Sequence, residues 1–301
     1  MVARPPSSVK PNATAVFRCA ASFLGFLRFA AMNEPDSPLP RPSNSVVRRA
    51  WRYFFIDPWQ ILDDERPTDA AAQSAASNQA KFALLLAAFC LTGLRYAGDN
   101  YVKFFPQLAI GEDGALYKLF WWSACCHFFY AIVPGTFLIL RGQSPLKFGG
   151  STRGLAQHAP LYLGLFLVML PVVVAASYTK TFQHAYPFHP YAGKSWFDFL
   201  TWEAAYAVQF ITLEFFFRGF LLFSLQPTFG SNAIFVMMVP YCMIHFQKPL
   251  PETLGAIGAG IILGTLALRT RSIWLGAGLH IAVAWTMDVL ALLHRGEFPP
   301  G

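Results

Sequence analysis

The C-terminal half of this 301-residue chain carries ionisable side chains inside long apolar stretches. At bilayer depth such a group costs several kcal/mol unless it is paired, so each one is a candidate for function. Six residues are of this kind: Glu203, Glu214, Arg218, His245, His280 and Asp288. The chemistry open to them is ion pairing, proton transfer and metal binding.

Glu214 and Arg218 lie four residues apart in the run from Leu213 to Gly219. Four residues make about one helical turn, so both side chains share a face and can form an ion pair. Such a pair keeps the carboxylate charged, because arginine opposes the desolvation that favours the neutral acid. The alternative is a pair that only locks two helices together, and these residues alone leave both interpretations open.

His245 ends an apolar run and has Tyr241 one helical turn before it, whereas His280 lies well inside the last apolar run. A single buried histidine is more often a hydrogen-bonded core residue than a catalyst. Two histidines and Glu214, on three different membrane helices, could instead deprotonate a water molecule or bind a metal ion. The residue types alone do not choose between these two chemistries.

Glu203 and Asp288 are expected to stand apart from that group. Glu203 lies eleven residues before Glu214, about 16 Å along a helix axis, and Asp288 lies eight residues after His280, about 12 Å. We expect Glu203 to be an interfacial carboxylate near a helix start. We expect Asp288 to meet the interface or a cation in a loop.

The elements that must position these residues follow from composition. Only 13% of the residues are charged, against roughly 25% in soluble domains, and ten of the 23 Lys and Arg precede Phe82. Long apolar runs in lipid form helices, because the backbone must satisfy its own hydrogen bonds. The sequence therefore predicts an all-α, polytopic transmembrane helical bundle of about seven spans (six to eight). They are expected near residues 82–98, 116–140, 159–178, 196–225, 232–246, 252–268 and 272–293.

The chain is expected to have three parts. Residues 1–45, rich in Pro and Ser, predict a disordered tail. Residues 46–80 predict an interfacial amphipathic segment, in which basic and aromatic residues mix, followed by a polar linker. The basic residues of the interfacial segment are Arg48, Arg49 and Arg52. Residues 81–295 are the predicted transmembrane helical domain.

Charge indicates the orientation and the partners. The loop at 141–158 and the turn at 269–271 are basic, as is the N-terminal tail, which predicts a cytoplasmic N-terminus. The net charge of +7 is spread over the tail and loops. This distribution favours contact with anionic lipid headgroups and makes nucleic acid a poor partner. The sequence does not indicate an oligomeric state.

The polar residues resemble the motifs of the CPBP family, the CAAX proteases and bacteriocin-processing intramembrane glutamic endopeptidases. That family carries Glu-Glu-x-x-x-Arg on one membrane helix, Phe-x-x-x-His on the next and His-x-x-x-Asn on a later one. In this chain Glu214 with Arg218 comes first, then Tyr241 with His245, and then His280. The order and the separations carry the resemblance, because each motif alone is weak.

The resemblance covers about residues 196–293 and implies an intramembrane endopeptidase acting on a membrane-associated protein or peptide. Glu214 would be the acidic residue, His245 its partner in polarising water, and His280 a second polar group at the tetrahedral intermediate. Arg218 would orient Glu214. Membrane lipids are the other implied partner, and a bacterial plasma (inner) membrane is the implied location. No cofactor is implied; the alternative is a divalent zinc ion bound by Glu214, His245 and His280.

Three family positions differ in this chain. Leu213 stands where the family has its first glutamate, the residue usually given the role of base. Ala284 stands where an asparagine would stabilise the oxyanion, and Tyr241 replaces Phe, which adds a hydroxyl. Leu213 and Ala284 favour an alternative function, that of a catalytically inactive membrane scaffold, chaperone or immunity factor with a CPBP-like fold.

Overall fold

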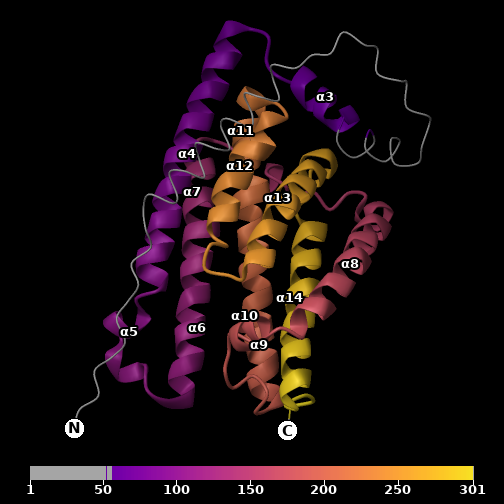
Figure 1. The fold of residues 1–301 in the computed structure, drawn as a ribbon. Coiled ribbons are helices and arrows are strands. Elements are labelled where there is room, and N and C mark those ends of the chain that lie inside the picture. Colours follow the sequence, from indigo (N-terminus) through magenta and orange to yellow (C-terminus); the bar gives the residue numbers. More distant parts are fainter. Residues whose placement is uncertain (1–51, 53–55, 301) are drawn as a thin grey trace, which may run out of the picture. The chain divides into compact units, whose positions relative to one another are not determined.

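The computed structural model describes Arg52 and residues 56–300, and these residues form helices joined by turns, with no β-strand among them. Six helical stretches are long and apolar enough to cross a membrane, and a shorter apolar helix, α12 (Asn232–Met243), accompanies them (Figure 1). The predicted all-α polytopic bundle of about seven spans is therefore confirmed. The predicted tail at 1–45 lies outside the described residues. Arg48 and Arg49 of the predicted interfacial segment also lie outside them.

The first long helix, α4 (Ala70–Gly98), begins earlier than predicted. Asp69 caps it, because its side-chain Oδ1 accepts a hydrogen bond from the backbone N–H of Ala72 at 2.9 Å. Residues 70–80, expected to be part of a linker, are helical because they are rich in alanine, the strongest helix former. With 29 residues the helix is about 44 Å long, so it extends beyond a hydrocarbon layer of about 30 Å.

Helices also flank α4 and form the region that follows it. They are α3 (Asp57–Asp64), α5 (Tyr101–Phe104), α6 (Gly111–His127), the π-helical segment η3 (Phe128–Ile132), α7 (Val133–Leu140), α8 (Leu155–Ser177) and α9 (Lys180–Ala185). The α6–η3–α7 stretch and α8 correspond to the spans predicted at 116–140 and 159–178. α8 contains Pro160 and Pro171, which membrane helices tolerate when neighbouring groups satisfy the freed backbone.

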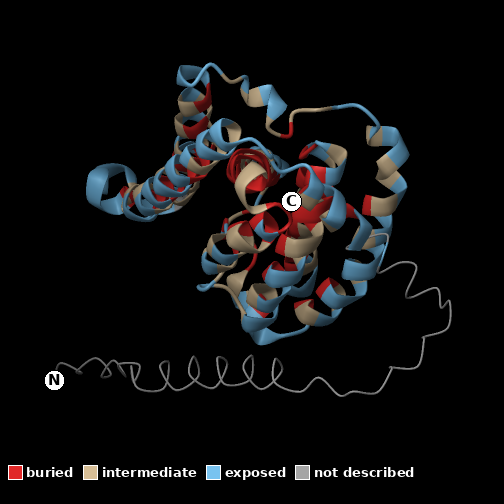
Figure 2. Cartoon of the chain, turned by 90° about the horizontal axis from the view of Figure 1, so that it is seen from above, coloured by how far each residue is buried: buried red, intermediate tan, exposed pale blue. Residues whose placement is uncertain are grey.

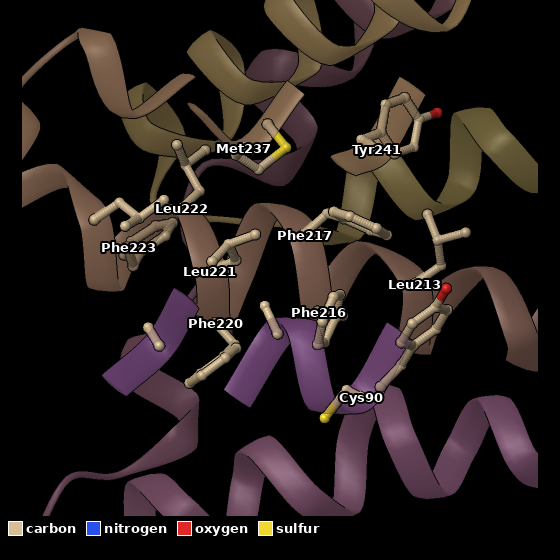
Figure 3. Close-up of a cluster of buried hydrophobic side chains, with 14 of the residues drawn as sticks. Cys90, Leu213, Phe216, Phe217, Phe220, Leu221, Leu222, Phe223, Met237 and Tyr241 are labelled. Carbon is tan, nitrogen blue, oxygen red and sulfur yellow. The ribbon is translucent and has the colours of Figure 1, made fainter. Parts of the chain in front are cut away.

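The central stretch of the bundle consists of α10 (Trp196–Glu214), the π-helical segment η5 (Phe215–Leu221) and α11 (Leu222–Phe229). It is the most buried of the candidate spans. Its phenylalanines and leucines lie in an apolar cluster with residues of α4, η3 and α12 (Figure 3). The cluster includes Cys90, Tyr130, Phe216, Phe217, Phe220, Leu221, Leu222 and Met237. This packing fixes the part of the chain that carries Glu214 and Arg218.

Helices α12 and α13 (Leu250–Thr270) form a hairpin whose two open ends meet α3. The Ser231 backbone N–H donates to Asp63 Oδ1 at 2.9 Å, and Arg271 Nη2 lies 2.9 Å from Glu65 Oε2. The chain then enters α14 (Trp274–Arg295). A backbone bridge joins the loop after α7 to the turn after α13, at Gly150 and Ser272. The two basic connections predicted to share a side therefore lie at the same end of the bundle.

The outer faces of the helices are apolar and exposed. Figure 2 shows the buried residues in the middle of the bundle and the exposed residues around it. Large apolar side chains stand on the exposed faces, among them Leu85, Phe89, Leu140 and Val168. Such a continuous apolar exterior is unusual for a soluble monomer and suits contact with lipid tails. The protein is an integral membrane protein.

Candidate active site

Glu214 and Arg218 form the predicted ion pair. Glu214 is the last residue of α10, Arg218 lies in η5, and Glu214 Oε1 is 2.9 Å from Arg218 Nη1. The two side chains are 1% and 0% exposed. The wide π-helical turn begins directly after Glu214, and such turns occur frequently at functional sites. Both side chains of the pair therefore belong to the most buried of the candidate spans.

His280 reaches the same carboxylate from α14. Its Nδ1 lies 2.8 Å from Glu214 Oε1, the oxygen that also faces Arg218. The His280 ring stacks on Phe210 of α10, with centroids 5.5 Å apart. His280 is 18% exposed, so of the three polar side chains it is the one that remains accessible. Two residues predicted from separate motifs thus meet in direct contact.

Tyr241 of α12 connects His280 and Arg218. Its hydroxyl lies 3.1 Å from His280 Nε2, and the Arg218 guanidinium lies over its ring, 3.8 Å from the centroid. A histidine that donates from Nδ1 to a carboxylate has Nε2 free to accept, so the tyrosine O–H is the donor in this arrangement. The guanidinium also gains a cation–π contact in a desolvated place. The Tyr241 hydroxyl, which phenylalanine lacks, therefore has a hydrogen-bonding partner in His280.

His245 lies beside this group but does not touch Glu214 or His280. Its Nδ1 is 2.9 Å from the Tyr241 carbonyl oxygen, and its ring packs edge-on against the Tyr241 ring at 4.9 Å between centroids. The predicted span 232–246 is too long: α12 ends at Met243, because the chain must reverse into α13. The Thr253 hydroxyl donates to the His245 carbonyl at 2.7 Å and stabilises this turn.

Gly276 permits the close approach of α10 and α14 at the site. A Cβ atom at this position would lie 2.9 Å from Glu214 Oε2, closer than side chains normally pack. Gly276 was not among the predicted site residues. The available signal was its place four residues before His280, which puts it one turn away on the same helix face.

Two of the three departures from the family motif lie in apolar packing. Leu213 belongs to the large central cluster, and Ala284 packs in a second cluster with Trp202 and Tyr206. Neither position brings a polar group to Glu214. Among the described residues, no group of three or more His, Cys, Asp or Glu side chains is arranged to hold a metal ion. Zinc binding by Glu214, His245 and His280 stays an alternative prediction.

The expectations for Glu203 and Asp288 are wrong. Both side chains are buried, and the Trp202 indole Nε1 donates to Asp288 Oδ2 at 2.9 Å. Neither is an interfacial carboxylate, because α10 and α14 pack against each other along this part of their lengths. Spacing along one helix could not show which side chains the other helix contributes.

Comparison with known proteins agrees with this geometry. Residues 195–286 match the family model described as type II CAAX prenyl endopeptidase Rce1-like. This region is Rce1-like. The resemblance to the CPBP family is thereby confirmed, and the Rce1-like region contains Glu214, Arg218, Tyr241, His245 and His280. No curated protein and no solved structure matches the chain. The family supports a protease as the kind of enzyme.

Proposed function

We propose that this protein is an intramembrane endopeptidase that hydrolyses a peptide bond of a membrane-associated protein or peptide. The observation that carries the proposal is the contact between Glu214 and His280. These side chains come from different membrane helices and meet in an apolar bundle, within the Rce1-like region. Ionisable groups are costly there, and a Glu–His pair is a common means of activating water.

Each polar residue has a role in this chemistry. The Glu214–His280 pair takes up the proton of the attacking water, the oxygen bonds to the peptide carbonyl carbon, and a tetrahedral intermediate forms. The same proton then passes to the leaving nitrogen as the C–N bond breaks. His245 holds the water from the neighbouring turn, and Arg218 keeps Glu214 charged and oriented. Once His280 Nε2 carries the proton taken from water, it no longer accepts from the Tyr241 hydroxyl, which then donates to the oxyanion, the function that Ala284 lacks.

An apolar cavity supports a substrate with an apolar group. The cavity has a volume of about 210 Å³ and lies against α10, η5 and the start of α14. Its walls include Ile211, Thr212 and Phe215, which flank Glu214 in the chain. The matched family is described as a CAAX prenyl endopeptidase. We propose for this chain the activity of an endopeptidase on a peptide held at the membrane.

The orientation and the cofactor requirement are also proposals. The basic connections after α7 and α13 lie at one end of the bundle, and such ends face the cytoplasm. We place this end, and with it the N-terminus, in the cytoplasm of a bacterial cell whose plasma membrane holds the protein. We propose that hydrolysis needs no metal ion, so that a chelator leaves the rate unchanged.

The test is product identification with the purified full-length protein in lipid. A membrane-anchored reporter peptide is incubated in water enriched in ¹⁸O, and its fragments are measured by mass spectrometry. The proposal expects one ¹⁸O atom in the new carboxyl group, no product from Glu214→Gln, and no effect of chelator. Absence of cleavage across a peptide library would support the scaffold alternative, which Leu213 and Ala284 favour. Loss of activity on chelation would overturn the metal-free mechanism.

A further inference from the structure

Glu203 and Asp288 form a second buried polar site, on the two helices that carry Glu214 and His280. Two cross-helix contacts place them side by side: the Trp202 indole donates to Asp288 Oδ2 at 2.9 Å, and the Trp285 indole donates to the Glu203 backbone carbonyl at 3.3 Å. Glu203 and Asp288 are 2% and 0% exposed. Within the described part of the chain, Glu203 Oε1 and Oε2 and Asp288 Oδ1 have no hydrogen-bond donor. Acceptor oxygens therefore face acceptor oxygens across the α10–α14 contact, which requires a hydrogen between them.

We propose that Glu203 and Asp288 bind one proton between them and thereby join α10 to α14. Two carboxylates that share an apolar site cannot both be ionised, because each destabilises the charge of the other. Asp288 Oδ2 already accepts from the Trp202 N–H at 2.9 Å, which stabilises Asp288 as the charged partner. Glu203 then carries the proton and donates it to Asp288, so the buried pair holds a single negative charge.

The surrounding charged groups do not replace the proton. The titratable groups that interact with the pair from the packed elements are Tyr186, Tyr206, Lys248 and Arg295. The two cations among them have other partners. Lys248 lies 2.5 Å from Glu252 Oε1, and Arg295 donates to the carbonyls of Gln183 and Tyr186 at 2.6 Å each. The proton is thus the charge that neutralises the second carboxyl.

We call the Glu203–Asp288 pair, which joins α10 to α14, the clasp. It lies at a distance from the Glu214–His280 pair. Glu203 lies about 16 Å from Glu214 along α10, so the clasp holds the helices without touching the reacting groups. Removal of the proton would place two negative charges between α10 and α14. The helices would then separate more easily, and the folded state would lose stability as the pH rises.

Infrared spectroscopy of the full-length protein tests the proton directly. At neutral pH the wild type should show the C=O stretching band of an un-ionised buried carboxyl group. The band should be absent from Glu203→Gln, whose amide supplies a permanent donor, and should persist in Asp198→Asn, which removes another carboxyl of α10. No band in the wild type, or a band that survives in Glu203→Gln, would overturn the proposal.

The pH dependence of unfolding gives a second, independent readout. Between about pH 6 and pH 8 the ratio of the wild-type unfolding constant to that of Glu203→Gln should rise by up to about tenfold per pH unit, because only the wild type holds the proton when folded. Asp288→Asn, which can accept from Trp202 and donate to Glu203, serves if Glu203→Gln does not fold. A ratio that does not change with pH contradicts the clasp. Neither readout depends on peptidase activity.

Discussion

Glu214 gathers two basic side chains, Arg218 and His280, around one carboxylate that is 1% exposed. The attraction in such a pair is offset by the desolvation of its members, so the pair itself adds little stability. Removing one member has a larger effect, because the other is left buried without a counter-charge. The stability of the ion pair and the chemistry of the site therefore need separate tests.

Glu214→Gln should lower the free energy of unfolding by about 3–5 kcal/mol, because the Arg218 charge loses its partner. Glu65→Gln breaks a pair with Arg271 whose members are 42% and 50% exposed, and should cost less than about 1 kcal/mol. Replacing both buried partners, Glu214→Gln with Arg218→Met, should recover most of the loss. Equilibrium unfolding in mixed detergent micelles measures all three variants. Equal losses for Glu214→Gln and Glu65→Gln would contradict this view of the site.

Tyr241→Phe tests the hydroxyl without disturbing the packing. The phenylalanine ring still lies under Arg218, so the melting temperature should change little. Loss of the donor should lower kcat by about 10²-fold with KM nearly unchanged, the effect of removing one oxyanion donor. Steady-state kinetics on the reporter peptide give both constants. A variant as fast as the wild type would show that the hydroxyl only positions His280.

At this scale the sequence predicted the pairing of Glu214 with Arg218, because helical spacing alone dictates it. It also grouped His280 with them, on the order of the motifs. It could not predict that His280 touches Glu214 directly, nor that Glu203 and Asp288 are buried on neighbouring helices. Those contacts depend on how two helices pack. The sequence pattern of one helix does not show which face of the other helix it will meet.

Helices α10 and α14 pack closely enough that a single glycine decides where Glu214 lies. Gly276→Ala would place a methyl group 2.9 Å from Glu214 Oε2, whereas an alanine at Gly278 would meet nothing within 4 Å. Both changes remove a glycine from the same helix and raise its helix propensity equally. Only the first should displace the carboxylate.

The expected result is a loss of about 10²-fold in kcat for Gly276→Ala and a rate near that of the wild type for Gly278→Ala. The physical reason is that a shift of about 1 Å in a reacting group is enough to spoil its alignment. Steady-state cleavage of the reporter peptide, corrected for the folded fraction, measures the difference. Equal rates for the two alanine variants would show that Glu214 tolerates displacement.

Element boundaries were the part of the fold least open to prediction. The long apolar spans follow from hydropathy, since lipid leaves helices as the available solution. The start of α4 depends on a cap at Asp69 and on alanine, which hydropathy counts as nearly neutral. The end of α12 depends on a turn stabilised by Thr253, a residue of the next helix. Both are local chemical effects that an average over a window of residues conceals.

For the whole molecule, the path of the chain predicts which ends share a side of the membrane. The loop that contains Lys147 lies at the end where α3 and the turn after α13 meet, and the chain returns from that end along α14 to Glu297. Lys147→Cys and Glu297→Cys should therefore react with a membrane-impermeant maleimide from opposite sides. Labelling of intact vesicles, with lysed vesicles as the control, measures this. Labelling of both positions from one side would require a different number of crossings.

We propose that Glu214 and His280 together activate water for peptide hydrolysis. The most direct test of this proposal is the kcat/KM of His280→Ala on the reporter peptide, with Gly278→Ala as the control for a change in the same helix. We expect a loss of at least about 10²-fold for His280→Ala and almost none for the control. A His280→Ala protein that cleaves the peptide at the wild-type rate would contradict it.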